Sequence, residues 1–506
     1  KNYRVLEGMA LINTHNSTIN YSSVKGTIYP MRVFFNSSFN TISSSNLTGE
    51  ATTSNIGLWI AYGASNNTVS GSNISTVNRQ TNNNYGVYIY LNASGNNITG
   101  NAITTNGTSN NHGIYVYTDS KYNIISKNCI RTLATNDNNK GIYVYTRSSG
   151  NVVANNTVST RGSQNNDVIM VDSYSHNNLI ENNTAASDAS NSVYGIGIKT
   201  YSQNTTVRCN NVTINNTNAQ TVYGIGLNDY VTGTLVDYNN ISMITYGAGT
   251  VGQNDGICLN SVVQNNTVTN NVINTGGPYD YHYGIYITYA SHNNLIENNT
   301  IRTGGRNYNH GIVLYGPTVN GMSMNVVIKN NTILPNGTSG INYGIYAQQW
   351  NSNITVDRNK VVTNGTYSDT GVLFTSYSSN SLIANNTIIA GGTAGAYNNY
   401  GIYLSDDSNN NAIADNNITT KGSGSSPGIQ IANSITNTTI AGNTIITSGT
   451  GASNYGVYGS SNVFDSTIEN NTINTTGTGN VNHGVYFTST ASRNIVRGNV
   501  INTNGT

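Results

Sequence analysis

Carboxylates are the first residues to consider for an active site, because general acid–base catalysis needs acids that converge in one cleft, with a base or calcium. The 20 acidic residues of this 506-residue chain are scattered. Asp406-Asp407 is the one pair of adjacent acids, and no third carboxylate joins it at equivalent positions of neighbouring repeats. Asp119 lies one repeat before Arg147 at the same offset, which predicts a surface ion pair of small energy. We therefore expect no enzymatic activity and no cofactor.

Histidines offer little metal chemistry. His112, His310 and His483 each occur within Asn-His-Gly, at a position that other repeats fill with tyrosine. They lie many repeats apart, whereas a metal site needs converging ligands. The sequence predicts aromatic residues at a loop edge and no metal site.

Aromatic residues recur two or four positions after a repeating glycine. At these offsets they alternate with inward-pointing residues, so they should face outward. Such a face is either a sugar-stacking platform or a packing surface for another subunit. We favour packing, because little charge surrounds it. The face consists of Trp59, Tyr88, Tyr90, Tyr115, Tyr117, Tyr143, Tyr145, Tyr286, Tyr346, Tyr403, Tyr458 and Tyr486.

The three cysteines fall in different repeats, and Cys129 and Cys258 occupy positions that should face outward. A disulfide needs Cα atoms within about 7 Å, and the repeat spacing keeps Cys129, Cys209 and Cys258 farther apart than that. Unpaired thiols are unusual in an extracellular protein. The sequence therefore predicts that at least one of the three forms a disulfide bridge between subunits.

The elements that position these residues come from one repeat, which Gly113 to Thr132 represents (GIYVYTDSKYNIISKNCIRT). Counted from Gly113, apolar residues fall at +1, +3, +12 and +17, and the frame recurs in 16 copies, mostly 27 to 30 residues apart. A fixed period of this length indicates a solenoid. Each copy has three short β-rich segments and none with helical period. The predicted fold is an all-β, right-handed parallel β-helix of about 18 coils with three strands each.

Asparagine occupies position +15 in 14 of the 16 copies, with Ser72 and Val326 as the exceptions. Stacked asparagine side chains pass hydrogen bonds from coil to coil, and asparagine tolerates the left-handed conformation of a sharp corner. The column therefore predicts a structural ladder rather than a binding site.

We expect a single domain over residues 1–506, in which residues 1–56 form degenerate coils and residues 57–506 regular ones. Length varies mainly after position +17, so one edge should carry the variable loops. The last coil closes at Ile501 without an amphipathic helix or a polar capping repeat. This predicts either strand edges able to pair with another chain or a flanking domain or cap that has been removed.

Composition limits the partners. Only 8% of residues are charged, against roughly 25% in ordinary domains, and the net charge is +1. No basic run suggests nucleic acid, no apolar stretch approaches the ~20 residues of a membrane helix, and no signal peptide is visible at Lys1. Loop sequons at Asn106, Asn336 and Asn364 are the candidate glycosylation sites and predict an extracellular location.

The frame G-I-Y-V/I … N-x-I … N-N-T-I resembles the parallel β-helix repeat of pectate lyases, polygalacturonases, carbohydrate-binding surface proteins and NosD-like periplasmic proteins. Its Asn, Ser, Thr and Tyr bias is most similar to secreted repeat proteins of methanogenic archaea, which implies a surface layer, sheath or filament. We therefore expect an extracellular structural protein that assembles with itself on the cell surface, with surface glycans as further partners. The alternative is a carbohydrate-binding or carbohydrate-cleaving β-helix that uses the tyrosine face.

Overall fold

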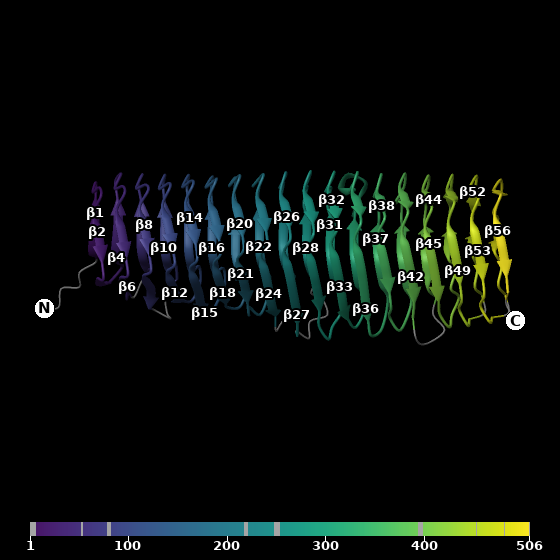
Figure 1. Cartoon of the computed structure of the whole chain (residues 1–506), viewed down its shortest axis with the longest axis horizontal. Coiled ribbons are helices and arrows are strands. Elements are labelled where there is room, and N and C mark those ends of the chain that lie inside the picture. The colour runs from purple at the N-terminus through teal and green to yellow at the C-terminus, as the bar shows by residue number, and fades with distance from the viewer. Residues whose placement is uncertain are drawn as a thin grey trace. The chain divides into compact units, whose positions relative to one another are not determined.

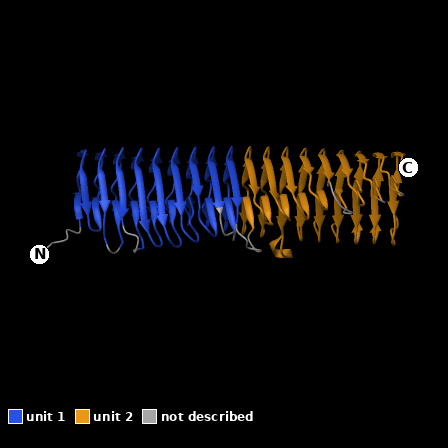
Figure 2. Ribbon diagram, turned by 90° about the horizontal axis from the view of Figure 1, so that it is seen from below, with its two compact units in different colours: residues 1–251 blue, residues 252–506 orange. Residues whose placement is uncertain are grey.

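The computed structural model describes residues 7–51, 54–77, 82–216, 221–246, 253–392, 398–451, 453–479 and 481–504. They divide into two compact units, residues 1–251 and residues 252–506 (Figure 2). Within each unit, short strands recur coil after coil and belong to three parallel sheets (Figure 1). We call them sheet 1, sheet 2 and sheet 3 in the order in which the chain enters them. The predicted single domain is not tested by this division and stays a prediction.

Unit 1 contributes nine strands to each sheet in its described residues. In sheet 1 they are β1 (Glu7–Ile12), β4 (Tyr29–Phe34), β7 (Ile56–Ala61), β10 (Tyr85–Tyr90), β13 (His112–Tyr117), β16 (Lys140–Tyr145), β19 (Ile169–Val171), β22 (Val193–Lys199) and β25 (Val222–Asn228). In sheet 2 they are β2 (Thr18–Asn20), β5 (Thr41–Ser43), β8 (Thr68–Ser70), β11 (Asn97–Thr99), β14 (Ile124–Ser126), β17 (Val152–Ala154), β20 (Leu179–Glu181), β23 (Thr206–Arg208) and β26 (Leu235–Asp237). In sheet 3 they are β3 (Ser23–Gly26), β6 (Asn46–Gly49), β9 (Asn73–Val77), β12 (Ala102–Gly107), β15 (Cys129–Ala134), β18 (Thr157–Arg161), β21 (Thr184–Ser187), β24 (Asn211–Asn216) and β27 (Asn240–Thr245).

Unit 2 repeats this arrangement with nine more strands per sheet, again counted over its described residues. In sheet 1 they are β28 (Asn254–Asn260), β31 (His282–Thr288), β34 (Asn309–Tyr315), β37 (Asn342–Gln348), β40 (Asp369–Thr375), β43 (Tyr400–Ser405), β46 (Ile429–Ala432), β50 (Val457–Ser460) and β54 (Val485–Phe487). In sheet 2 they are β29 (Thr267–Thr269), β32 (Leu295–Glu297), β35 (Val327–Lys329), β38 (Thr355–Asp357), β41 (Leu382–Ala384), β44 (Ala412–Ala414), β48 (Thr439–Ala441), β52 (Thr467–Glu469) and β55 (Ile495–Arg497). In sheet 3 they are β30 (Val272–Gly276), β33 (Thr300–Gly305), β36 (Thr332–Gly337), β39 (Lys360–Thr363), β42 (Thr387–Gly391), β45 (Asn417–Lys421), β49 (Thr444–Thr447), β53 (Thr472–Thr475) and β56 (Val500–Thr503). A separate pair, β47 (Ile435–Thr436) and β51 (Val463–Phe464), completes the strands.

The core of each unit consists of the predicted inward columns. In the coil of Gly113, Ile114, Val116, Ile125 and Ile130 are 0% exposed. Each inward residue pairs with its equivalent one coil on, as Ile125 does with Val153. The predicted parallel β-helix with three strands per coil is therefore confirmed.

The repeating glycine has a steric cause. A Cβ on Gly113 would lie 2.2 Å from the core Ile130 Cγ2 and 2.5 Å from the Gly141 carbonyl oxygen. Gly113 thus faces the core, as does Ile114 beside it, and two consecutive inward residues break the strand alternation. As a consequence, the residue before each glycine points outward, onto the same face as positions +2 and +4.

The asparagine ladder at +15 is confirmed, and it spans several coils in each unit. Asn128 Nδ2 donates to Asn156 Oδ1 at 3.0 Å, and Asn128 Oδ1 accepts from Asn101 Nδ2 at 3.0 Å. The left-handed corner is the preceding residue, such as Asn155 with φ of 57°. Asparagine at +15 therefore serves hydrogen bonding, and the corner conformation belongs to +14.

One coil departs from the frame because it contains the 3₁₀ helix η1 (Val319–Gly321). The insertion shifts the following residues, so that Ile328 pairs with Ile296 and Asn331 Oδ1 accepts from Asn299 Nδ2 at 3.0 Å. Val326 was predicted as an exception in the ladder, and this was wrong, because Asn331 occupies that position once the insertion is counted.

Among the residues that the structure describes, none belongs to a helix long and apolar enough to cross a membrane.

Candidate functional site

The outward face of sheet 1 in unit 1 carries the predicted aromatic ladder. Tyr115 lies between Tyr88, with ring centroids 5.2 Å apart, and Tyr143, at 5.1 Å and an interplanar angle of 5°. A second row, Tyr90, Tyr117 and Tyr145, stacks beside the first at 5.5 Å between coils. Parallel rings this close must be offset-stacked, so each covers part of a neighbour's face. The interior of this ladder thus presents ring edges and hydroxyls to solvent.

Packing in the ladder affects the phenols. Tyr115 is only 8% exposed, although its side chain points away from the core. Burial raises the pKa of Tyr88, Tyr115 and Tyr143 far above that of free tyrosine, and neighbouring phenols add to the effect. These hydroxyls remain neutral hydrogen-bonding groups and cannot serve as bases near neutral pH.

In unit 2 the aromatic residues of sheet 1 do not form an unbroken column. Tyr286, Tyr346, Tyr403 and Tyr458 alternate with Val313, Leu373 and Gln430 along the register. Val313 and Leu373 are apolar and buried, at 3% and 6% exposed, and fill their places. Tyr458 and Tyr486 stack again at 5.6 Å.

A notch opens where Gln430 replaces an aromatic ring. β46 lies between β43 and β50, and on this face its coil offers Gln430 on the strand and Pro427 just before it, in place of the tyrosines of the two neighbouring coils. The resulting cavity has a volume of about 220 Å³. Its lining consists of Asn398, Tyr400, Ser425, Pro427, Gln430, Ser453, Tyr455 and Tyr458.

An ionisable cluster lies on sheet 1 of unit 1, next to the ladder. Lys140 Nζ is 3.0 Å from Asp167 Oδ2, and both side chains are under 10% exposed. Lys140 Nζ also donates to Asn138 Oδ1 at 2.8 Å, and Asp167 Oδ1 accepts from the Tyr194 amide at 2.9 Å. The groups needed for acid–base chemistry are present, but neighbouring protein groups satisfy them, as in a structural ion pair.

Two of the three histidines are placed differently from the prediction of a loop edge, whereas His483 is exposed and precedes β54 (Val485–Phe487) as expected. His112 and His310 lie within β13 and β34 and are 5% and 2% exposed. His310 stacks between Tyr283, at 5.2 Å, and Tyr343, at 4.7 Å, and its Nδ1 accepts from the Tyr343 amide at 3.1 Å. The inward glycine is the reason, since it turns the preceding residue onto the aromatic face.

Substituting His310→Tyr should weaken the acid sensitivity of the fold. Burial lowers the pKa of His310 to about 3, so the folded protein keeps this ring neutral while the unfolded chain binds a proton below about 6.5. The associated stability is present above pH 6.5 and is lost as pH falls toward 3. At pH 4.5 this loss amounts to about 2–3 kcal/mol.

Thermal unfolding between pH 4 and 7.5 measures this effect. The variant should show a shallower fall of Tm with acid than the wild type, even if its stability at pH 7.5 is lower. Parallel curves for the two proteins would contradict the assignment.

Acidic residues do not gather. Asp406 Oδ2 accepts from the Thr375 hydroxyl at 2.8 Å, and its pKa is lowered because hydrogen bonds from Thr375, Asn433 and Ser405 outweigh burial. Asp369 is buried, and burial raises its pKa to about 6. Asp119 and Arg147 form the predicted ion pair at 2.8 Å. Within the described ranges, no group of three or more His, Cys, Asp or Glu residues could hold a metal ion.

None of the three cysteines forms a disulfide within the chain. Cys129 and Cys209 are exposed, whereas Cys258 occupies the outward position expected for it but is 0% exposed. Its strand β28 lies in register with β31, where Tyr286 occupies the equivalent position, and this crowded face covers the thiol. An intersubunit disulfide stays a prediction, and it now concerns Cys129 or Cys209.

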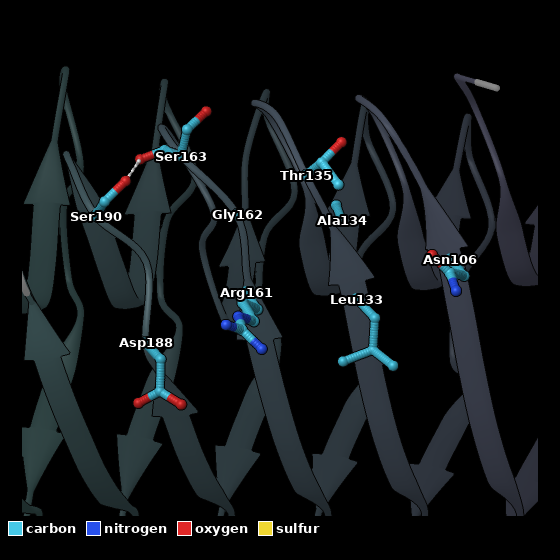
Figure 3. A pocket seen from close by; sticks show the side chains of 9 residues that line it. All are labelled: Asn106, Leu133, Ala134, Thr135, Arg161, Gly162, Ser163, Asp188 and Ser190. Atoms are coloured by element: carbon cyan, nitrogen blue, oxygen red, sulfur yellow. Dashed lines mark hydrogen bonds between the residues drawn. The ribbon is translucent and has the colours of Figure 1, made fainter. Parts of the chain in front are cut away.

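A groove on sheet 3 of unit 1 was not foreseen from the sequence. It has a volume of about 570 Å³ and runs along the end of the sheet, where Asn106, Leu133, Arg161 and Asp188 follow one another in successive coils (Figure 3). A smaller groove of about 350 Å³ lies on sheet 3 of unit 2, lined by Asn274, Thr275, Arg302, Thr303, Gly304, Leu334 and Asn336.

Two of the asparagines in predicted glycosylation sequons, Asn106 and Asn336, line these grooves. Asn336 and Asn364 are exposed and Asn106 is half-buried. Glycosylation of these residues stays a prediction.

Further asparagine ladders also escaped the sequence reading. One stands two residues before the glycine, where Asn84 Nδ2 donates to Asn111 Oδ1 at 2.8 Å, and another at +10, where Asn96 donates to Asn123 at 3.1 Å. The recurrence of asparagine at these offsets could have predicted the additional ladders. The notch could have been predicted with less certainty from the polar Gln430, which occupies a position that the neighbouring coils fill with tyrosine.

Comparison with known proteins identifies the fold. A family described as "Right handed beta helix region" matches residues 208–388 and 322–473, which together span a little over half of the chain. The predicted handedness is thereby confirmed. No curated protein sequence matches the chain.

Solved structures that resemble the chain do so at low identity. A double mutant of the periplasmic alginate epimerase AlgG is 14% identical, with a TM-score of 0.36, and the match covers 68% of this chain and 77% of that one. The A-module of the Azotobacter vinelandii mannuronan C-5 epimerase AlgE6 is 12% identical, with a TM-score of 0.31 and coverage of 87% and 91%. The alginate lyase AlyGC is 10% identical, with a TM-score of 0.33 and coverage of 98% and 97%.

These neighbours correct one expectation. The prediction that the chain is not an enzyme is contradicted by similar structures named as epimerases and a lyase, and it is withdrawn. At such identities and TM-scores the likeness carries no activity or substrate over to this chain.

Proposed function

We propose that this chain, which belongs to the family of right-handed β-helix proteins, binds a saccharide on the outward face of sheet 1, at the notch in unit 2. The observation that carries the proposal is the missing aromatic ring at Gln430, between coils that carry tyrosines. The proposal concerns binding of the saccharide and includes no chemical reaction.

The dimensions of the notch suit a sugar ring. Coils in a parallel sheet are about 4.8 Å apart, so the tyrosines on either side of β46 belong to coils about 9.6 Å apart. A flat ring midway between them would lie about 4.8 Å from each, within the range of stacked ring contacts. In unit 1 the same distance is filled by a tyrosine, as Tyr115 fills the space between Tyr88 and Tyr143.

The polar lining of the notch suits the hydroxyls of a sugar. Gln430 is 9% exposed, and its side-chain amide makes no hydrogen bond to another described residue. Asn398, Ser425 and Ser453 add amide and hydroxyl groups around the rim. Apolar ring faces with a few convergent polar groups are typical of small-molecule sites.

Substitution of Tyr455→Ala or Gln430→Ala should weaken saccharide binding about tenfold or more, since Tyr455 forms one side of the notch and Gln430 supplies the amide at its centre. The wild type is screened on an array of neutral and acidic oligosaccharides, and the best ligand is titrated by calorimetry into each variant. Incubation of the same proteins with polyuronates, followed by assay of released products, tests for turnover.

Tyr377→Ala is the matched control, because Tyr377 is 46% exposed and stacks on Trp350 outside the notch. It should bind as the wild type does. Absence of any bound oligosaccharide, or an equal loss in Tyr377→Ala, would contradict the proposal.

Assembly into a surface layer, sheath or filament at the outside of the cell stays a prediction. It is motivated by the low charge of the chain and by the aromatic face of unit 1, and it is compatible with saccharide binding in unit 2.

A further inference from the structure

Sheet 3 has an unusual distribution of charge. Its strands contain six basic residues and no acidic residue in either unit, over the described residues: Lys25, Arg131, Arg161, Arg302, Lys360 and Lys421. The whole chain, by contrast, has nearly equal numbers of basic and acidic residues, 21 and 20. The excess of positive charge on sheet 3 is therefore local.

Unit 2 shows the contrast most clearly. Its basic residues outside sheet 3 all form ion pairs with acids at 2.7 to 3.3 Å: Arg306, Lys329, Arg358, Arg493 and Arg497. The three on sheet 3, Arg302, Lys360 and Lys421, form no ion pair with the residues that the structure describes in this unit. The cause is the register, since an acid one coil away is what pairs most of the others, and sheet 3 has none.

These cations lie on one face. Arg302 is on β33, Lys360 on β39 and Lys421 on β45, so successive cations are two coils, or about 9.6 Å, apart along the axis. The register also offsets Arg302 and Lys421 from Lys360 by two and four residues along the strands, so the Cα separations are about 12 Å and about 16 Å. All three side chains are exposed. These separations exceed the screening length of about 8–10 Å in physiological salt, so each cation acts as a separate contact for a charged chain that runs along the sheet.

The groove beside Arg302 supplies a specific contact. Asn274 and Leu334 flank Arg302 in register on β30 and β36, and Asn336 lies one position farther along β36 than the strand partner of Thr303. A guanidinium forms paired hydrogen bonds to a carboxylate or sulfate. The two amides suit sugar hydroxyls, and Leu334 offers an apolar surface to the ring.

We propose that sheet 3 of unit 2 binds an anionic polysaccharide, with an acidic sugar in the groove at Arg302 and further acidic sugars at Lys360 and Lys421. A nucleic acid is disfavoured, because the strands of this sheet carry no aromatic residue on which bases could stack. This site is separate from the notch on sheet 1 and does not depend on the function proposed above.

The test compares two triple variants of equal charge. One replaces Arg302, Lys360 and Lys421 by glutamine, and the other replaces the ion-paired Arg306, Arg358 and Arg497 by glutamine. Both variants lower the net charge by three, so a difference in affinity between them depends only on where the charges were removed. Probes are oligogalacturonate, its fully methyl-esterified neutral form, and an oligothymidylate of the same charge as oligogalacturonate, each titrated at several salt concentrations, with unfolding curves to verify that the variants fold.

The wild type should bind oligogalacturonate at least tenfold more tightly than the methyl ester, with an affinity that falls as salt rises. The triple variant of Arg302, Lys360 and Lys421 should bind oligogalacturonate about tenfold or more weakly than the wild type, and the control triple variant less than twofold more weakly. The affinity of Arg302→Lys should lie between them, because lysine keeps the positive charge but cannot form the paired hydrogen bonds of a guanidinium. Equal losses in the two triples, equal binding of ester and acid, or equal binding of the oligothymidylate would each overturn the assignment. Variants at Tyr455 should leave this binding unchanged, which separates the two sites.

Discussion

Replacing Asn128 by alanine is expected to destabilise unit 1 by about 4 kcal/mol. The side chain is buried and makes four hydrogen bonds: its Nδ2 donates to the Ile98 carbonyl at 2.8 Å and to Asn156 Oδ1 at 3.0 Å, and its Oδ1 accepts from the Asn101 amide and from Asn101 Nδ2 at 3.0 Å. Alanine leaves these partners buried without a replacement, and no water can reach a closely packed ladder to compensate.

Urea unfolding followed by circular dichroism measures the effect, with Asn136→Ala as the control. Asn136 is an exposed loop residue of the same coil, so its replacement should cost less than about 0.5 kcal/mol. Hydrogen exchange should further show lost protection near Asn101, Asn128 and Asn156. A cost at Asn128 similar to that at Asn136 would mean that the ladder does not stabilise the fold.

Replacing Gly113 by alanine is expected to cost at least about 3 kcal/mol, although it adds a single methyl group. The Cβ would lie 2.2 Å from Ile130 Cγ2 and 2.5 Å from the Gly141 carbonyl oxygen. Relief requires movement of a core side chain and of the backbone of the next coil, and both are held by packing and strand pairing.

Gly49→Ala provides the control, because Gly49 also lies in a strand of unit 1 and its added Cβ would meet no atom closer than 3.5 Å. This variant should stay within about 1 kcal/mol of the wild type. If the two glycines tolerated alanine equally well, the inward orientation of Gly113 would be refuted. Thermal unfolding of both variants decides between these outcomes.

The aromatic face shows how far sequence reasoning reached. Alternation correctly placed Tyr88, Tyr115 and Tyr143 on the outward side of sheet 1, because side-chain direction in a strand follows position. It misplaced His310, since the double inward step at the glycine depends on packing between coils, and it gave no sign that neighbouring residues bury the outward-pointing Cys258. The exposure of a side chain depends on the residues that pack against it, and in this fold those residues belong to adjacent coils, about 27 to 33 residues away in the sequence.

The sequence by itself determined the parallel β-helix, its core columns and its principal asparagine ladder, because a repeated coil places equivalent residues in register and every such residue meets its own copy. Only the tertiary structure decided where departures from the repeat create candidate binding sites. The notch at Gln430 exists because rings in flanking coils leave one ring's thickness unfilled, and the unpaired cations on sheet 3 of unit 2 exist because none of them has an acid one coil away. Both are differences between adjacent coils, and their consequence depends on the distances and side-chain packing that the fold imposes.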